Sequence, residues 1–154
     1  MRTLRNMRGF TLIELLIVMG ILGILLAIVL IALNPQAQFK EANDTQRRSD
    51  VVAILDAVHQ YVIDHKGALP TGIDTTVRSV ASGAGNADLC SSVVPTYIAD
   101  LPQDPTTGTR TPSGLCTSAT SYNTGYTIVS SASNNRVTVA APAAEGGTAI
   151  SVTR

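Results

Sequence analysis

The sequence predicts an α+β protein in which one long N-terminal helix, half membrane-spanning and half amphipathic, packs on a small C-terminal antiparallel sheet. An uninterrupted apolar run first occupies residues 12–33. Apolar residues then recur at helical spacing within residues 35–67. Residues 126–154 finally contain short runs in which Thr alternates with Val, separated by Ser, Asn and Gly.

The first structural segment, residues 10–34, contains the apolar run from Leu12 to Leu33, and Glu14 is its sole charged residue. A helix of that length spans about 33 Å, which is enough to cross a bilayer core of about 30 Å. A helix at the surface of a soluble domain would carry a polar stripe, and this run carries none. We therefore predict a transmembrane helix.

Charged residues around the run predict its orientation. Three arginines and no acid lie in residues 1–9, namely Arg2, Arg5 and Arg8. The positive-inside rule then places the chain start in the cytoplasm and the remainder outside a single-pass inner-membrane anchor. A secretory signal peptide also begins in this way, but its apolar core is shorter and a small-x-small cleavage site follows it. Any cleavage is therefore expected before the run.

The string Arg8-Gly9-Phe10-Thr11-Leu12-Ile13-Glu14 resembles the processing signature of the type IV pilin and pseudopilin family. In that family a membrane aspartyl peptidase cuts after the glycine and methylates the new amino terminus. The resemblance implies a pilin-like fold, a cleaved basic leader at residues 1–9 and cleavage between Gly9 and Phe10. It further implies N-methylation of Phe10, with the prepilin peptidase and methyltransferase and the membrane as partners.

Glu14 requires a reason to lie in an apolar run, since a charge at mid-membrane costs about 2.5–3.5 kcal/mol. Cleavage would create a cationic amine on Phe10, four residues earlier and on the same helix face. The carboxylate can pair with its own amine in the stored monomer, or with that of a neighbouring subunit in a filament. We therefore predict an assembly role for Glu14. The alternative is a passive glutamate favoured by the helix dipole.

Residues 35–67 predict a second helix, or a kinked continuation of the first past Pro35. The resemblance implies a weak helical segment that unwinds on assembly. The family often has a proline at the position that Ile31 occupies here, so the location of the unwinding segment stays open. Gly67 fits the helix C′ position. One face is apolar, comprising Val51, Ile54, Leu55, Val58, Tyr61 and Val62.

The earlier half of this second helix is polar nearly all round. We expect it to bridge from the membrane to the head and to contact other subunits. Arg47 and Arg48 are interpreted as solvated or intersubunit charges, in preference to a nucleic-acid patch.

Residues 68–125 are rich in Gly, Ser, Thr, Pro and Asp and predict a loop-rich region. Cys90 and Cys116 lie in it and predict a disulfide if the region is exported, with two unrelated buried thiols as the alternative. Such a bridge is worth roughly 3–4 kcal/mol. The string from Leu101 to Pro105, L-P-Q-D-P, resembles a segment of major pseudopilins and minimal bacterial pilins.

Residues 126–154 predict an antiparallel meander of three strands. The strand signals cover residues 126–129, 136–139 and 149–152, with turn residues between them. One face of this sheet is expected to pack on the apolar stripe around Ile54 and Val58.

No catalytic motif, cofactor site or metal site is predicted. His59 lies three residues after Asp56, and His65 directly follows Asp64, but no third ligand has matching spacing, so both pairs are interpreted as polar helix positions. Asp100 and Asp104 are interpreted as turn formers in preference to calcium ligands.

The charge balance argues against bulk nucleic-acid binding. The chain has eleven cationic and eleven acidic residues, with three of the cations in the leader, so the remainder carries a net charge of about −3.

The predicted function is a structural subunit of a type IV pilus-like filament for adhesion, motility or DNA uptake. Its partners are further copies of itself in a helical homopolymer and an assembly platform with its ATPase. The mature form would lie in an extracellular or periplasmic filament. The alternative is a major pseudopilin of a type II secretion system. A signal-anchored membrane enzyme or binding protein that never polymerises fits the leader motif less well.

Overall fold

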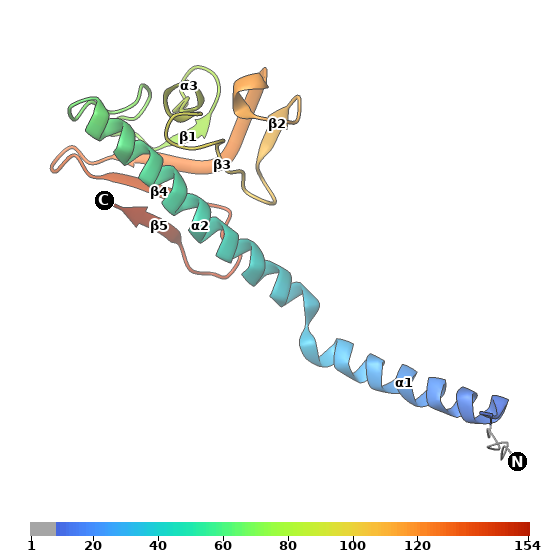
Figure 1. Ribbon diagram of the computed structural model, residues 1–154. Helices are drawn as coiled ribbons and strands as arrows, with labels where there is room; N and C mark the ends of the chain where they lie inside the picture. Colours follow the sequence, from blue (N-terminus) through green and yellow to red (C-terminus); the bar gives the residue numbers. More distant parts are fainter. Residues whose placement is uncertain (1–8) are drawn as a thin grey trace, which may run out of the picture. The chain divides into compact units, whose positions relative to one another are not determined.

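The computed structural model describes residues 9–154, which divide into two units at Phe39 and Lys40. The leader arginines Arg2, Arg5 and Arg8 lie outside the described residues. The first unit contains helix α1, Leu12–Leu33, and the start of α2, Pro35–Asp64. The second unit contains the remainder of α2 and the head that packs on it (Figure 1). A long helix followed by a small antiparallel sheet is the α+β, pilin-like arrangement that the sequence predicts.

A break at Asn34 separates α1 from α2. Asn34 adopts the left-handed conformation, with φ 40° and ψ 75°. Asparagine tolerates this region better than most residues, and it therefore often ends a helix. Pro35 then begins α2, where its fixed φ suits the first helical position and its missing N–H leaves no partner unsatisfied. The structure therefore has a separate second helix, and not a kinked continuation of the first.

The C-terminal end of α2 is a Schellman motif. The Gly67 N–H donates to the Val62 carbonyl at 2.8 Å, and the Lys66 N–H donates to the Ile63 carbonyl at 3.4 Å. These bonds place Lys66, with φ 55°, at C′ and Gly67 one residue later. The prediction of Gly67 at C′ is thus wrong by one residue, since the turn uses two consecutive left-handed residues.

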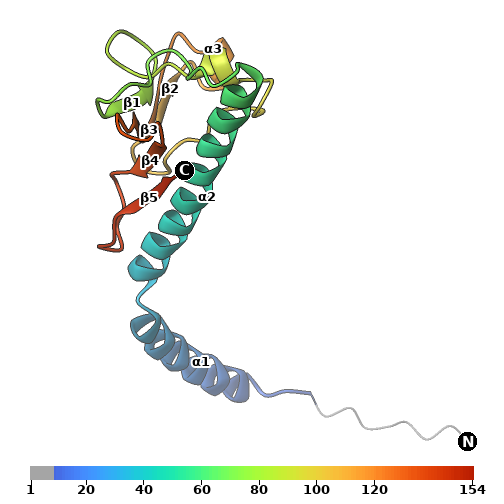
Figure 2. The same cartoon turned by 90° about the vertical axis from the view of Figure 1, so that its left-hand side faces the viewer.

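The head contains a five-stranded antiparallel sheet in the order β1-β3-β4-β5, with β2 also paired to β3. Its strands are β1 Arg78–Ala81, β2 Thr109–Thr111, β3 Ser121–Ser130, β4 Val137–Ala141 and β5 Ile150–Thr153. The predicted meander corresponds to β3, β4 and β5, with Val139 opposite both Ile128 and Val152. Figure 2 shows β1, β3, β4 and β5 side by side against α2.

The region predicted as loop is more regular than its composition indicates. It holds β1 and β2, the short helix α3 at Cys90–Val93 and the 3₁₀ turn η1 at Cys116–Ser118. Strand β3 also begins at Ser121, five residues before the predicted start. Tyr122 and Thr124 are buried in this extension. Short polar strands such as these are stabilised by pairing with β3, which local composition does not reveal.

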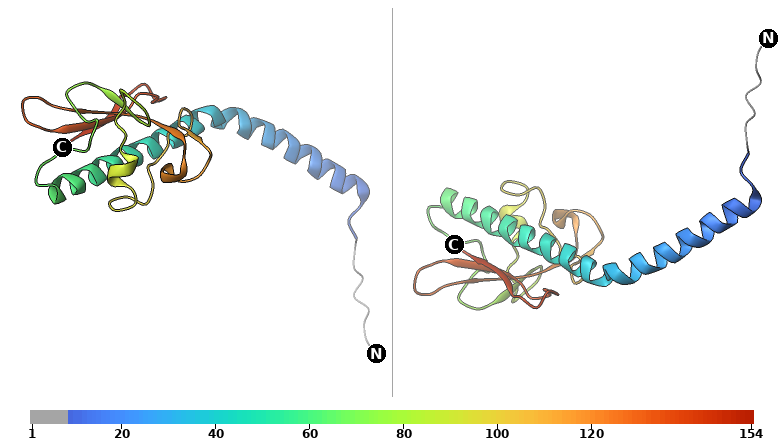
Figure 3. Two further views of the ribbon diagram at one scale, coloured as in Figure 1. Left: turned by 90° about the horizontal axis from the view of Figure 1, so that it is seen from above. Right: turned by 90° about the horizontal axis from the view of Figure 1, so that it is seen from below.

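The core of the head lies between α2 and one face of the sheet. Val51, Ile54, Leu55 and Val58 are at most 1% exposed, and Tyr61 and Val62 pack at the margin of the cluster, so the predicted apolar face is confirmed. The strands contribute Tyr126, Ile128, Val137, Val139 and Ile150. Both views of Figure 3 show the C-terminal strands on one side of α2.

Candidate functional site

The peptide bond between Gly9 and Phe10 lies in a non-helical segment just before α1. Phe10 is 85% exposed, and a Cβ added to Gly9 would meet nothing within 4 Å. Thr11 is extended, with φ −83° and ψ 150°. An extended, uncovered segment is open to an enzyme that must surround a peptide bond.

Thr11 and Glu14 form a capping box at the start of α1. The Glu14 N–H donates to Thr11 Oγ1 at 3.3 Å, and the Thr11 N–H donates to Glu14 Oε2 at 3.4 Å. These bonds satisfy backbone donors that have no partner within a helix. The capping role of Thr11 was not predicted, although the T-x-x-E spacing is a known sequence signal for this cap.

The capping box also changes the expected geometry around Phe10. Because Thr11 is the N-cap, the helix begins at Leu12 and Phe10 lies outside it. The expected placement of Phe10 and Glu14 on one helix face is therefore absent from this unprocessed chain. Glu14 instead contacts Thr11, one residue closer along the chain.

Helix α1 is apolar on every side and has no buried residue. Its aliphatic and methionine side chains are between 49% and 84% exposed. It is the candidate membrane span by length and composition. In water all of these apolar side chains would be exposed to solvent. A helix with this surface is therefore more stable in lipid or against other apolar helices.

Arg47 is fully buried and joins α2 to two distant loops of the head. Its Nε donates to Asp104 Oδ2 at 2.6 Å, and its Nη2 donates to Thr106 Oγ1 at 2.7 Å. Its Nη1 donates to Asp44 Oδ1 at 2.8 Å and to Glu145 Oε2 at 3.1 Å. We call Asp44, Arg47, Asp104, Thr106 and Glu145 the Arg47 cluster.

Asp44 and Asp104, the two buried acids of the Arg47 cluster, also accept hydrogen bonds from backbone N–H groups. Asp44 accepts from the N–H groups of Glu145 at 3.0 Å and Gly146 at 2.6 Å. Asp104 accepts from those of Thr106 at 2.9 Å and Thr107 at 2.8 Å. Each carboxylate thus fixes one loop against α2 while its charge is matched by the guanidinium.

The pKa values of these carboxyls follow from the same bonds. The Glu145 N–H and Arg47 hold the pKa of Asp44 below its usual value. Burial raises the pKa of Asp104, but the hydrogen bonds from Arg47 and the Thr106 and Thr107 N–H groups outweigh burial and lower it strongly. The hydrogen bond to Asp104 raises the pKa of Arg47 despite burial. The cluster is therefore charged throughout the physiological range.

The cluster corrects the interpretation of the early part of α2. Asp44 and Arg47 were expected on a polar surface that bridges to the head or contacts other subunits, but they are 2% and 0% exposed. Arg48, the next residue, is exposed as expected. The partners of Arg47, Asp104 and Glu145, are far away in the sequence. No local pattern therefore identifies Arg47 as the buried arginine and Arg48 as the exposed one.

A disulfide joins Cys90 and Cys116, whose Cα atoms are 6.0 Å apart. It links α3 to η1 and closes a loop with a sequence separation of 26. Asp100 accepts from the Cys116 N–H at 2.9 Å and from Arg110 Nη1 at 2.5 Å. Asp104 accepts from N–H groups two and three residues later, as a turn former does, whereas Asp100 binds Arg110 and the distant Cys116 N–H.

Both histidines lie in or just after the C-terminal half of α2. His65 stacks on Tyr61 with ring centroids 3.8 Å apart, and Asp56 pairs with Arg154. Within residues 9–154, no group of three or more His, Cys, Asp and Glu side chains is arranged to hold a metal ion.

Comparisons with known proteins agree with the N-terminal geometry. Residues 4–30 match the family model described as the prokaryotic N-terminal methylation motif. The chain is also 35% identical over 103 residues to the type II secretion system core protein G of Aeromonas hydrophila. That match covers 66% of this chain and 68% of the relative. No solved structure matches the chain.

Proposed function

Because the chain belongs to the type IV pilin and pseudopilin family, we propose that it is the structural, non-enzymatic subunit of a helical homopolymer. It is stored in the inner membrane through α1 as a prepilin, with its head outside. The observation that carries this proposal is the exposed Gly9–Phe10 bond directly before a helix of membrane length whose sole charged residue is Glu14.

Processing is the first step of the proposed pathway. A prepilin peptidase cuts between Gly9 and Phe10 and the Phe10 amine is methylated. The non-helical conformation of residues 9–11 supports this step, since no helical hydrogen bond must break to expose the bond. The new ammonium group would lie one residue before Thr11, whose N–H now donates to the Glu14 carboxylate.

Assembly is the second step, driven by an assembly platform with its ATPase. In the filament the apolar surface of α1 packs against α1 helices of other copies, which replaces lipid contacts by protein contacts. Glu14 then pairs with the Phe10 amine of a neighbouring subunit. A charge left unpaired in an apolar surrounding is costly, so the requirement for pairing supports one axial register between otherwise featureless helices.

The type of filament has two candidates. A type IV pilus subunit for adhesion, motility or DNA uptake has the same helix, leader and head. A major pseudopilin of type II secretion is favoured by one specific observation, the 35% identity to a type II secretion system core protein G. The mature subunit would act in an extracellular filament in the first case and in a periplasmic one in the second.

Mass spectrometry of the mature protein tests processing. We expect a chain that begins at Phe10 and carries one additional methyl group. A mature chain that begins beyond Leu33 would contradict the proposal, because it would have lost α1 as an ordinary signal peptide.

Gene deletion followed by electron microscopy and analysis of secreted proteins separates the two filament types. Loss of surface filaments that contain this chain, with secretion intact, identifies a pilus subunit. Loss of protein secretion without loss of surface filaments identifies a pseudopilin. A deletion strain that keeps both its surface filaments and its protein secretion would contradict both candidate functions.

A further inference from the structure

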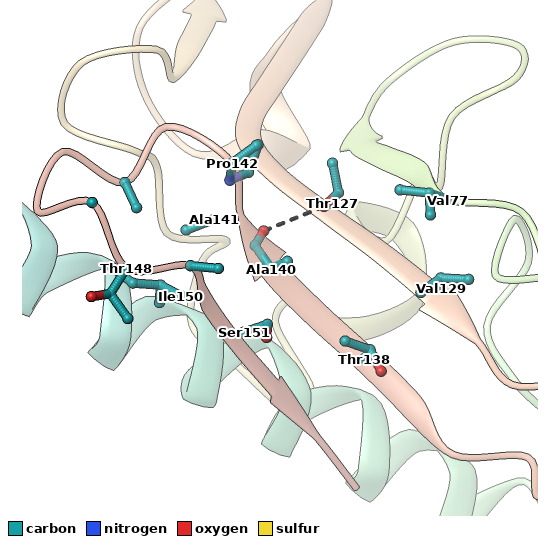
Figure 4. A pocket seen from close by; sticks show the side chains of 13 residues that line it. Val77, Thr127, Val129, Thr138, Ala140, Ala141, Pro142, Thr148, Ile150 and Ser151 are labelled. Atoms are coloured by element: carbon teal, nitrogen blue, oxygen red, sulfur yellow. Dashed lines mark hydrogen bonds between the residues drawn. The ribbon is translucent and has the colours of Figure 1, made fainter.

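The face of the sheet opposite α2 carries a groove of about 510 Å³. It runs across β3, β4 and β5, whose groove-lining residues include Val129, Thr138 and Ser151 (Figure 4). These alternate along their strands with core residues such as Ile128 and Val139, so they face away from α2. The segment between β4 and β5 forms one wall, including Pro142 and Thr148. We call this the outer-face groove.

The lining of the outer-face groove indicates what it can hold. It consists of Val, Ile, Ala, Pro, Gly, Thr and Ser side chains, without a charged or aromatic residue. A phosphate, a metal ion or a nucleic acid would meet no charged partner there, and a sugar ring would meet no aromatic face. Small aliphatic and hydroxyl groups instead suit an uncharged aliphatic side chain presented by a protein.

Leu115 is an apolar side chain of that kind on the same chain. It is 53% exposed, in the segment between β2 and η1. Both neighbouring residues are anchored. Arg110 Nη1 donates to the Gly114 carbonyl, and Cys116 is held by the disulfide and by Asp100. An exposed leucine on a fixed loop loses little conformational entropy on binding, which favours a contact role.

The groove and Leu115 are separate patches of the head, since Leu115 does not line the groove. Strand β2, which leads to Leu115, pairs with residues 121–123 of β3, whereas β4 pairs with residues 127–130. The sheet path continues from β3 through β4 to the edge strand β5, where the groove lies. A contact between two different patches of identical chains is heterologous, and its repetition builds an open polymer.

We infer that Leu115 of one copy inserts into the outer-face groove of a second copy in the filament. This inference rests on the proposed function, because it assigns a head-to-head contact to the polymer. It gives the Cys90–Cys116 bridge and the Asp100–Arg110 pair a shared consequence, since both hold the loop that presents Leu115. The absence of charge from the groove matches the absence of charge on residues 111–115.

Photo-crosslinking in assembled filaments tests the contact. The full-length chain carries p-benzoylphenylalanine in place of Leu115, and a second strain carries it in place of Ile63, which is 76% exposed on α2. We expect crosslinked dimers from position 115 whose second peptide contains residues 127–129 or 138–140, and none of that kind from position 63. Filaments in which position 115 crosslinks elsewhere, or not at all, would overturn the inference.

Substitution provides a second readout. Leu115→Ser and Ala140→Glu should each lower filament yield by about tenfold or more, since one removes the buried side chain and the other places a charge in the groove. Ile63→Ser is the matched control and should leave yield unchanged. Thermal unfolding of each full-length variant in detergent checks that the head is intact.

Normal yield from Leu115→Ser would overturn the contact while leaving the filament itself established. Absence of any polymer of the unmodified chain would instead overturn the proposed function, and the inference with it.

Discussion

Helix α1 and the head treat side chains in opposite ways. In α1 every aliphatic residue is exposed, from 49% for Val29 to 84% for Leu12 and Ile31. In the head the largest fully buried side chain is a charged one, Arg47, at 0%. The usual rule of apolar residues inside and charged residues outside is therefore reversed at both places.

The two reversals have different physical causes. The exposed apolar surface of α1 suits lipid or, in the proposed filament, other copies of the helix, so the helix would depend on association for its stability. The buried Arg47 is stable because three carboxylates and a hydroxyl surround it. It replaces apolar packing where two irregular loops must meet α2. The first region is thus specified by environment and the second by internal partners.

We expect the largest effect, loss of filament assembly, from removal of the Glu14 carboxylate in α1. Glu14→Ala should insert at least as well as the unmodified chain, because a charge leaves the hydrocarbon. In the filament the Phe10 amine would lose its partner, and an unpaired buried charge costs roughly 3–5 kcal/mol at every subunit. Cell fractionation and electron microscopy should find processed monomer in the membrane and no filaments.

Asp64→Asn is the control for this substitution, because Asp64 is an exposed acid at the C-terminal end of α2, away from the half expected to contact other subunits. It should assemble normally. Normal filaments from Glu14→Ala would show that Glu14 only caps the helix with Thr11, and the pairing argument would be wrong.

Arg47 and Arg48 are adjacent arginines that test the second region. Arg47→Ala leaves the Asp44 and Asp104 carboxylates without their cation and should lower the free energy of unfolding of the head by about 3–5 kcal/mol. Arg48→Ala should change it by less than about 0.5 kcal/mol, because Arg48 is exposed. Denaturant titration of the full chain in detergent measures both. Equal effects would refute a structural role for the cluster.

Removal of the disulfide should have a slightly smaller effect. The double substitution Cys90→Ser and Cys116→Ser opens a loop with a sequence separation of 26, which corresponds to roughly 3–4 kcal/mol in the chain-entropy model. Reduction of the unmodified protein should reproduce the loss. Unchanged stability in both experiments would mean that the loop is held by the Asp100 and Arg110 bonds alone.

The acid dependence of stability is the smallest effect. The depressed pKa values of Asp44, Asp104 and Asp74, the last at about 2, indicate stability that is complete above the unfolded pKa of about 4. It is lost as the pH falls toward and below the folded values. Burial raises the pKa of Asp50, which opposes this trend in part.

A pH series of melting temperatures should therefore be flat from about pH 7 to 5 and fall below about pH 4. Arg47→Ala should give a shallower profile, because Asp44 and Asp104 keep their backbone hydrogen bonds but lose the guanidinium that also lowers their pKa values. A melting temperature that rises on acidification of the unmodified protein would contradict the assigned pKa directions.

The sequence alone determined the features that depend on short-range patterns. The apolar run, the leader string and the period of the α2 apolar face all reside in contiguous residues, and they predicted α1, the family and the core face of α2. The helix boundaries differ from the prediction at single positions, where Thr11 caps the start of α1 and Lys66 takes the left-handed position after α2. The three C-terminal strands were also recognisable, since their alternation is local.

Tertiary structure decided what depends on partners distant in the chain. Strands β1 and β2 form because β3 supplies their hydrogen-bond partners, although their own composition resembles a loop. Arg47 is buried and Arg48 is exposed because Asp104 and Glu145, 57 and 98 residues later, meet only one face of α2. A local pattern cannot show this choice, because the free energy of burying a charge is set by groups that only the fold brings together.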